Sequence, residues 1–255
     1  MLGASGWSFI RGEWHEAEVD STNDQARRLI EADELGPLPA LVWADRQTRG
    51  RGQGANAWWS DGGSLTASVV LDPEAYGLAV GVRPRVALGG AVAVVGAIAA
   101  VVPDCHAGIR WPNDVEVAGR KLGGILVEGV AGRAGPRLIV GVGLNVASRV
   151  AVAPGEVRAM AASLAEFGAG VEHREPILAA ILDRLDPTLW ALAGGDPALV
   201  ATWNRLDALR GEAIRVQVGA ELFAAVAEGI DPTGGLRIVR DGRAEVLHAG
   251  RILRD

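Results

Sequence analysis

The sequence predicts an α/β (α+β) fold in which a mixed β-sheet is flanked by helices and followed by a small C-terminal β module. Aliphatic and β-branched runs bounded by glycines recur between residues 64 and 146, as is typical of buried strands. An alanine-rich apolar run at 86–102 has the length of a buried helix. Short alternating segments with glycine turns between them fill residues 213–248. Too few helices separate the strands for a doubly wound parallel sheet.

The composition is that of an ordinary folded protein. Of its 255 residues, 49% are hydrophobic and 22% are charged, which excludes an intrinsically disordered chain. Because 25 basic residues stand against 31 acidic ones, the formal net charge is −6. We therefore expect no nucleic-acid partner, since phosphate contacts need a basic surface.

Two features bear on the compartment of the protein. A single cysteine, Cys105, excludes an intramolecular disulfide and a cysteine metal cluster, and the first seven residues lack the basic and apolar regions of a signal peptide. The run at 86–102 is near the lower length limit of a membrane span, and its glycines favour a helix inside the protein. We therefore expect a cytoplasmic protein with no membrane partner.

The first half of the chain is expected to alternate between helix and strand. Ser21 or Thr22 caps a helix over 24–34, and a short apolar strand follows at 40–44. Residues 46–57 carry three glycines within five residues and predict a flexible basic loop. Glycine-bounded runs predict the remaining strands, at 64–71, 108–111, 122–130 and 137–146.

The second half is expected to divide into a helical part and a β part. Leucines and isoleucines at helical spacing predict helix from Pro176 to about Asp207. The pattern then changes, and we place a boundary between a larger domain, 1–208, and a smaller one, 209–255. Alternation and turn residues, among them an Asp-Gly pair typical of tight hairpins, predict strands at 213–218, 222–230, 236–240 and 244–248.

The segment 49–52, Arg-Gly-Arg-Gly, is suited to bind an anion. Its glycines permit close approach of backbone amides, and its arginines add guanidinium donors that suit a carboxylate or a phosphate. Arginine–glycine stretches are often plain solvated turns, so the loop alone is weak evidence. Trp58 and Trp59 follow it, and at least one ring could stack on a flat heterocycle such as a nucleobase; packing of both rings in the core is the alternative.

A second group of polar residues lies at 110–114, Arg-Trp-Pro-Asn-Asp, with Lys121 shortly after it. Asn113 and Asp114 supply hard oxygen ligands, which suit Mg²⁺ held jointly with phosphate oxygens. Lys121 begins a strand beside glycines, where its charge could meet an activated carboxylate. Taken separately, these are a turn and a surface lysine. Together with the first loop they indicate a site that admits a nucleotide.

A series of motifs over nearly the whole chain, in matching order and spacing, resembles those of the biotin protein ligases. They are Ser21-Thr22-Asn23, Gln47 with Gly50-Arg51-Gly52, Trp58-Trp59-Ser60, Trp111-Pro112-Asn113-Asp114, Arg120 to Glu128, and Gly141 to Asn145. The resemblance implies ATP-dependent attachment of biotin, through biotinyl-5′-adenylate, to a lysine of the biotin carrier domain of a carboxylase. It implies a catalytic domain with a class II synthetase-like mixed sheet and an SH3-like C-terminal barrel. Because the first motif lies so near the start, we expect no winged-helix DNA-binding domain. The resemblance does not decide the oligomeric state, which is either a monomer or a homodimer.

The resemblance also implies roles for individual residues. The residues matching biotin-binding positions are Ser21, Thr22, Asn23, Gln47, Gly50, Arg51, Gly52 and Gly124. The residues matching nucleotide-binding positions are Trp58, Asn113, Asp114, Lys121 and Asn145. Lys121 and Arg51 match the catalytic cations, where fixed positive charge stabilises the transition state. Asn113 and Asp114 would position Mg²⁺.

The chain departs from the family pattern in its loop. The usual loop is Gly-Arg-Gly-Arg-x-Gly-Arg, whereas Gln53 and Asn56 replace the second and third arginines here. A charge-assisted hydrogen bond contributes roughly 1.5–3 kcal/mol, so the hold on the adenylate should weaken. Either Arg49 moves in and the intermediate is retained, or the adenylate leaks and modifies bystander lysines. Near the end, Arg251 stands where relatives often carry glutamate.

Two other functions stay open. One is ligation of lipoate or another acyl group on the same fold, although lipoyl-type members lack a Gly-Arg-Gly loop followed by two tryptophans. Octanoyl transfer would need a cysteine nucleophile, and Cys105 lies in none of the motifs. The other is a non-catalytic module that binds biotin or an acyl-adenylate. Lys121, Asn113 and Asp114 argue against it, because a binding protein needs no transition-state groups.

Overall fold

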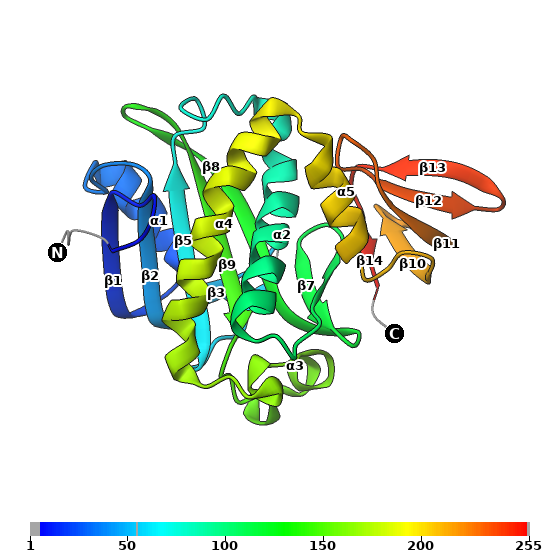
Figure 1. The fold of residues 1–255 in the computed structure, drawn as a ribbon, viewed down its shortest axis with the longest axis horizontal. Coiled ribbons are helices and arrows are strands. Elements are labelled where there is room, and N and C mark those ends of the chain that lie inside the picture. Colours follow the sequence, from blue (N-terminus) through cyan, green and yellow to red (C-terminus); the bar gives the residue numbers. More distant parts are fainter. Residues whose placement is uncertain (1–5, 55, 254–255) are drawn as a thin grey trace.

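The computed structural model describes residues 6–54 and 56–253 (Figure 1). Within these residues, seven strands form a large sheet in the order β1-β2-β5-β9-β8-β7-β6, and five form a second sheet in the order β13-β12-β11-β10-β14. In the large sheet β1 and β2 run parallel, and all other neighbours run antiparallel. The expected α/β class with a mixed sheet flanked by helices is confirmed.

The strands expected in the large sheet are all present. Its strands are β1 (Gly12–Val19), β2 (Ala40–Gln47), β5 (Ser64–Leu71), β6 (Gly108–Arg110), β7 (Asp114–Val117), β8 (Arg120–Gly132) and β9 (Gly135–Asn145). Strands β1 and β7 were not expected, because β1 is polar and mostly exposed and β7 is short. The predicted flexible loop contains a two-stranded hairpin, in which β3 (Gly50–Arg51) pairs with β4 (Ala57–Trp58).

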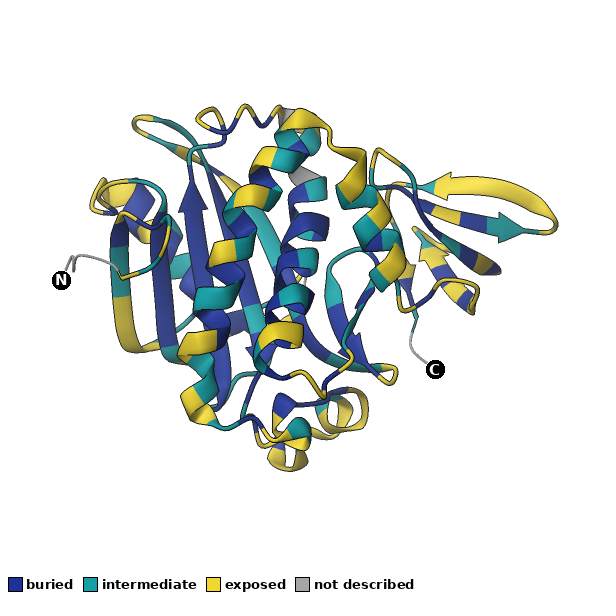
Figure 2. Cartoon of the chain, viewed as in Figure 1, coloured by how far each residue is buried: buried dark blue, intermediate teal, exposed yellow. Residues whose placement is uncertain are grey.

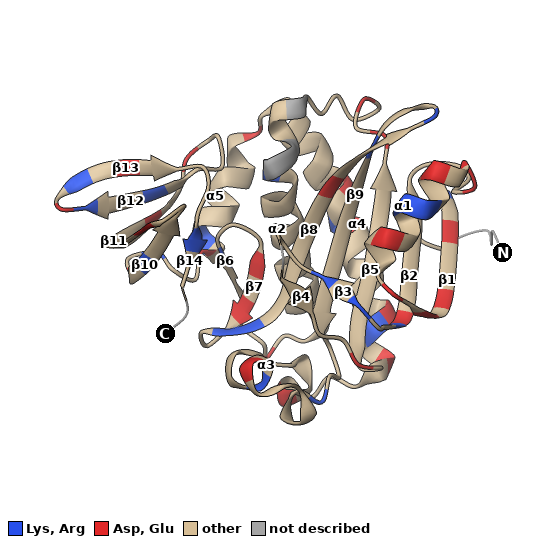
Figure 3. Ribbon diagram, turned by 180° about the vertical axis from the view of Figure 1, so that it is seen from behind, with Lys and Arg blue, Asp and Glu red and all other residues tan. Residues whose placement is uncertain are grey.

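The helices cover both faces of the large sheet. Helices α2 (Arg83–Val101) and α4 (Arg174–Gly194) lie on one face, and α1 (Thr22–Ala32) lies on the other (Figures 1 and 3). Short helical turns complete the chain: η1 (Val80–Val82), η2 (Val150–Val152), α3 (Gly155–Met160), η3 (Leu164–Phe167) and η4 (Val171–His173).

Helix α1 forms where its capping and apolar residues predict it. Ser21 is its N-cap, and Ala26, Leu29 and Ile30 are buried along one face. This face packs on small and branched residues of the sheet, including Val42. The helix places its N-terminus over the middle of the large sheet, where the amide of Thr22 finds a side-chain partner in Gln47.

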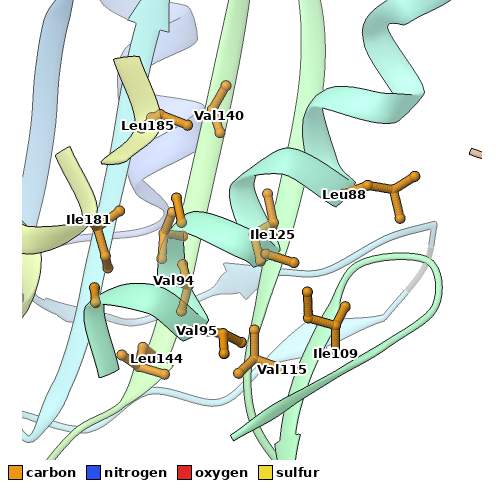
Figure 4. Close-up of a cluster of buried hydrophobic side chains, with 14 of the residues drawn as sticks. Leu88, Val94, Val95, Ile109, Val115, Ile125, Val140, Leu144, Ile181 and Leu185 are labelled. Atoms are coloured by element: carbon orange, nitrogen blue, oxygen red, sulfur yellow. The ribbon is translucent and has the colours of Figure 1, made fainter. Parts of the chain in front are cut away.

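The main core lies between the other face of the sheet and helices α2 and α4 (Figures 2 and 4). Val94 and Val95 of α2 pack among Ile125, Leu144 and Ile181 (Figure 4). A Cβ atom on Gly89 of α2 would approach side-chain carbons of α4 to 2.8 Å, so glycine permits the close approach of the two helices. In the described residues, no helix is long and apolar enough to cross a membrane.

The single helical stretch expected at 176–207 is interrupted, and that expectation was wrong in this detail. Helix α4 ends at Gly195, which adopts the left-handed conformation with φ 68°. Helix α5 (Pro197–Leu206) then begins behind Asp196, whose carboxylate accepts from the amide of Ala198. A C-terminal glycine followed by an N-capping aspartate is the ordinary way to end one helix and begin another.

The C-terminal sheet is antiparallel throughout. It contains β10 (Ala213–Val218), β11 (Glu221–Ile230), β12 (Leu236–Arg240), β13 (Arg243–Leu247) and β14 (Arg251–Ile252). The four expected strands are confirmed, and β14, which holds the exposed Arg251, was not expected. Closure into an SH3-like barrel and the boundary at 208/209 stay predictions. Trp111 ties this sheet to the large one, because its Nε1 donates to the carbonyl of Gly234 at 3.1 Å.

Candidate active site

The candidate site lies on the face of the large sheet that carries α1, at a place where several glycines leave the backbone of the sheet without side chains. Gly124 of β8 pairs with Gly143 of β9, and Gly141 pairs with Ser68 of β5, so all four face the same side. A Cβ atom on Gly141 would collide with Oδ1 of Asn23, and one on Gly143 would lie 2.7 Å from the Trp58 ring. The glycines therefore form a floor on which these two side chains rest.

Buried polar side chains line one end of this floor. The amide of Thr22 donates to Oε1 of Gln47 at 2.7 Å. Oγ of Ser68 lies 2.6 Å from Oδ1 of Asn23 and 2.8 Å from Oγ1 of Thr22. Ser21, like these four residues, is less than 9% exposed. The sequence motifs Ser21-Thr22-Asn23 and Gln47 are thus brought together in one polar pocket.

The β3–β4 hairpin, which we call the flap, lies on the side of the large sheet that carries α1 (Figure 3). A Cβ atom on Gly50 would lie 2.8 Å from Nε2 of Gln47, so the flap backbone approaches the polar pocket closely. The guanidinium of Arg51 binds Glu128 through two nitrogens, at 3.2 and 2.6 Å, and Asp24 at 2.9 Å. The Arg51 guanidinium is therefore held against α1 and β8.

Lys121 and Asp114 lie at the other end of the floor. Nζ of Lys121 donates to Oδ1 of Asp114 at 2.5 Å, and a Cβ atom on Gly124 would lie 3.4 Å from both. The turn before Asp114 is fixed because Nδ2 of Asn113 donates to the carbonyl of Ile125 at 2.7 Å. Asn145 lies behind Lys121, where its Nδ2 donates to the carbonyl of Ala162 at 3.0 Å.

Trp58 connects the two ends of the site. Its backbone pairs with Gly50 in the flap, its ring lies on Gly143, and Nζ of Lys121 is 5.9 Å from its ring centroid. Arg51 and Lys121 therefore lie over the same sheet face, at opposite ends of one floor.

Several buried polar atoms at this site have no hydrogen-bond partner in the part of the chain that the structure describes. They are Nε of Arg51, Nε1 of Trp58 and Oδ1 of Asn145. Buried polar atoms are nearly always paired in folded proteins, so such a group of unpaired atoms around one floor indicates the position of a ligand.

The loop positions that depart from the family pattern lie away from the floor. Gln53 and Asn56 are exposed, and Nδ2 of Asn56 donates to the carbonyl of Gln53 at 2.9 Å. Arg49 is 80% exposed, and its guanidinium lies 3.7 Å from Asp20. Arg49 does not occupy the place of a missing arginine in this structure.

Four residues to which no site role was assigned take part in this arrangement: Asp24, Ser68 and Glu128 contact predicted residues, and Arg27 contacts Glu128. A signal existed for Ser68, which with Ser64 and Thr66 places hydroxyl groups in a strand that is fully buried. Glu128 stood at the end of a matched motif, where nothing in the local pattern indicated its partners.

Glu128 is held ionised by these contacts. Burial alone would raise the pKa of its carboxyl group, but donors from Asn23 and Arg51 outweigh burial and lower it. The same carboxylate counteracts the effect of burial on Arg51 and raises the pKa of its guanidinium. The charges under the flap therefore balance.

The fold and the site together define an α/β protein with a small-molecule site, in which a glycine floor is flanked by a flap and by a lysine–carboxylate pair. The model of the biotin/lipoate A/B protein ligase family matches residues 17–145. The chain belongs to this family.

Relatives in this family share nearly the whole length of the chain. It is 31% identical to a biotin–[acetyl-CoA-carboxylase] ligase of Mycobacterium tuberculosis, over 99% of this chain and 92% of that protein. It is 30% identical to a biotin–[acetyl-CoA-carboxylase] ligase of Paracoccus denitrificans, over 92% and 98%. A solved structure of biotin protein ligase from Aquifex aeolicus in complex with biotin and ATP is similar with a TM-score of 0.81 and 25% identity, over 96% of this chain and 100% of that one. The resemblance read from the motifs is confirmed, and the chain is a ligase.

Proposed function

We propose that this protein attaches biotin to a lysine of a carboxylase biotin carrier domain, using ATP and forming biotinyl-5′-adenylate. The observation that carries the proposal is the glycine floor with a polar pocket at one end and the Lys121–Asp114 pair at the other. Relatives named as biotin–[acetyl-CoA-carboxylase] ligases support the substrate and the acceptor.

The polar pocket suits the ureido group of biotin, which offers two N–H donors and one carbonyl acceptor. Thr22 and Gln47 supply both donors and acceptors there, and the backbone of the flap lies directly above Gln47. Burial of these groups excludes water, so a ligand that lacks the matching polar atoms would leave them unpaired at a cost of roughly 1–3 kcal/mol each.

The carboxylate of biotin would then lie toward Lys121. In the first step one of its oxygens attacks the α-phosphorus of ATP, the bond to the β-phosphate oxygen breaks, and pyrophosphate leaves. Negative charge builds on the oxygens at this junction, and the ammonium group of Lys121, oriented by Asp114, stabilises it. In the second step the amine of the carrier lysine attacks the acyl carbon, loses a proton and expels AMP.

The chemistry of Asn113 and Asp114 fits Mg²⁺. Nδ2 of Asn113 is committed to Ile125, so its carbonyl oxygen is the atom suited to a metal, beside the carboxylate of Asp114. In the described residues, no group of three or more His, Cys, Asp and Glu side chains could hold a metal ion. The ion would therefore be shared with phosphate oxygens, whose charge it neutralises. Trp58 would border the adenine, and Asn145 the adenosine side.

We further propose a catalytic domain at 1–208 and an SH3-like barrel at 209–255, a cytoplasmic location, and no nucleic-acid partner. The antiparallel C-terminal sheet supports the barrel, and the net charge of −6 supports the absence of a nucleic-acid partner. The choice between monomer and homodimer stays open in this proposal.

Pyrophosphate release tests the proposed function. We expect release to require both ATP and biotin, and lipoate to give none. Release with lipoate in place of biotin would favour the lipoyl alternative, and binding of biotin without release would favour a non-catalytic module. An octanoyl transfer is disfavoured, because Cys105 is 2% exposed and burial raises the pKa of its thiol to about 11.

A further inference from the structure

Glu128 connects two parts of the site that lie apart in the sequence. Its carboxylate accepts from Nδ2 of Asn23 at 2.7 Å, from two nitrogens of Arg51 at 3.2 and 2.6 Å, and from Arg27 at 3.1 Å. Only 18% of its side chain is exposed. One carboxylate thus contacts the polar pocket through Asn23 and the flap through Arg51.

The charge of Glu128 decides the direction of the hydrogen bonds in the pocket. An ionised carboxylate only accepts, so the amide of Asn23 must present Nδ2 to Glu128 and Oδ1 to Ser68. Oδ1 also only accepts, and therefore the one proton of the Ser68 hydroxyl is used there. Oγ1 of Thr22, which carries one proton of its own, lies 2.8 Å from Oγ of Ser68 and 3.2 Å from Oε1 of Gln47, and it therefore links Ser68 to Gln47.

The end of this chain of hydrogen bonds faces the ligand. Both of these contacts are within the protein, and either one uses the single hydroxyl proton of Thr22, so Oγ1 has only a lone pair to present to the pocket. The amide of Thr22 meanwhile uses Oε1 of Gln47, so Gln47 is oriented with Nε2 beneath the flap. The pocket therefore offers an acceptor at Thr22 and a donor at Gln47, which a ureido group can match.

The same carboxylate holds the flap. Arg51 is a flap residue whose side chain forms ion pairs with the body of the protein, where Glu128 and Asp24 bind it. Arg27 and Arg51 balance Glu128 and Asp24 in charge, so removal of one carboxylate leaves two guanidinium groups facing one acidic partner.

We propose that Glu128 is a positioning residue that sets the hydrogen-bond polarity of the biotin pocket and, through Arg51, holds the flap over it. The inference rests on the proposed function. It predicts that a change at Glu128 weakens biotin binding although Glu128 lies beyond Asn23 and does not touch the ligand.

Glu128→Gln tests this role with little change in shape. A glutamine amide has one acceptor oxygen in place of two, so its NH2 group must face donors, either those of Arg27 and Arg51 or those of Asn23 and Arg51, and the amide of Asn23 is no longer fixed in one orientation. We expect the biotin Kd, measured by calorimetry without ATP, to rise at least tenfold, which is more than the rate of adenylation at saturating biotin falls. Amide hydrogen exchange of the flap, residues 50–58, should become faster.

A matched control and a second variant complete the experiment. Glu221→Gln removes the carboxylate that Arg240 binds at 2.7 Å on the C-terminal sheet, and it should bind biotin as the wild type does. Ser68→Ala breaks the chain of hydrogen bonds without touching the flap charges, and it should raise the biotin Kd without changing exchange of the flap. It also serves as the test if Glu128→Gln does not fold.

The outcomes separate this inference from the proposed function. If the wild type binds no biotin, the proposed function fails before any variant is compared. If the wild type binds biotin and Glu128→Gln binds it equally well, the positioning role is overturned. Where Glu128→Gln does not fold, equal binding of biotin by Ser68→Ala overturns the role instead. A loss confined to the adenylation rate at saturating biotin would overturn it as well, because that loss would place the charge at the reacting atoms.

Discussion

Asp207, at the end of α5, allows a prediction of stability whose size follows from the structure. Burial raises the pKa of its carboxyl group from 3.8 to about 6, because one oxygen, Oδ2, is buried with no hydrogen-bond partner in the described residues. The other oxygen accepts from the amide of Leu209 at 3.0 Å, which offsets burial in part.

The folded state therefore binds this proton more tightly than the unfolded state, whose carboxyl group titrates near 3.8. The contribution of Asp207 to the free energy of unfolding is therefore most favourable at low pH, where its carboxyl group is protonated in both states. It falls as pH rises from about 4 to 6 and is least favourable above the folded pKa. A shift of about 2 units corresponds to roughly 3 kcal/mol at neutral pH. Asp207→Asn keeps the acceptor for Leu209 and removes the buried charge.

We expect Asp207→Asn to raise the free energy of unfolding by about 2–3 kcal/mol at pH 7.5 and by less than about 1 kcal/mol at pH 4. Urea denaturation at both values measures this, with the exposed Asp104→Asn as a control that should change neither. Equal gains at the two pH values would refute the reasoning, because they would show that the charge of Asp207 is not what costs stability.

Three further predictions concern the site. Lys121→Ala should slow biotin-dependent pyrophosphate release at least tenfold, about 1.4 kcal/mol of barrier; an unchanged rate would remove Lys121 from the reaction. Gly143→Ala places a methyl group 2.7 Å from the Trp58 ring, so the KM for ATP should rise about tenfold with biotin binding unchanged, whereas Gly62→Ala, which meets nothing within 4 Å, should be neutral. With biotin, ATP and an unrelated lysine-rich protein, we expect label on the bystander lysines and less of it with Gln53→Arg; an unlabelled bystander would exclude leakage of the adenylate.

Local patterns were sufficient for most elements. The strand at 64–71 lies where its apolar run predicts it, because both of its faces are buried, and the helix over 24–34 lies close to where its capping and spacing predict it, because one of its faces packs on the sheet. Strand β1 escaped prediction because it is an edge strand with exposed polar residues, and only its pairing with β2 makes it a strand. Gly195 and Asp196, which divide the C-terminal helices, carried a local signal that helical spacing on both sides outweighed.

The sequence by itself determined the family, the class of fold, the lysine–carboxylate pair and the residues of the polar pocket other than Ser68, because these lie in short motifs with their own chemistry. Only the tertiary structure decided which partners they have. Ser68 meets Asn23 across 45 residues, and Glu128 meets Arg51 across 77. Such contacts depend on strand order and register, which bring distant segments together and which no local pattern contains.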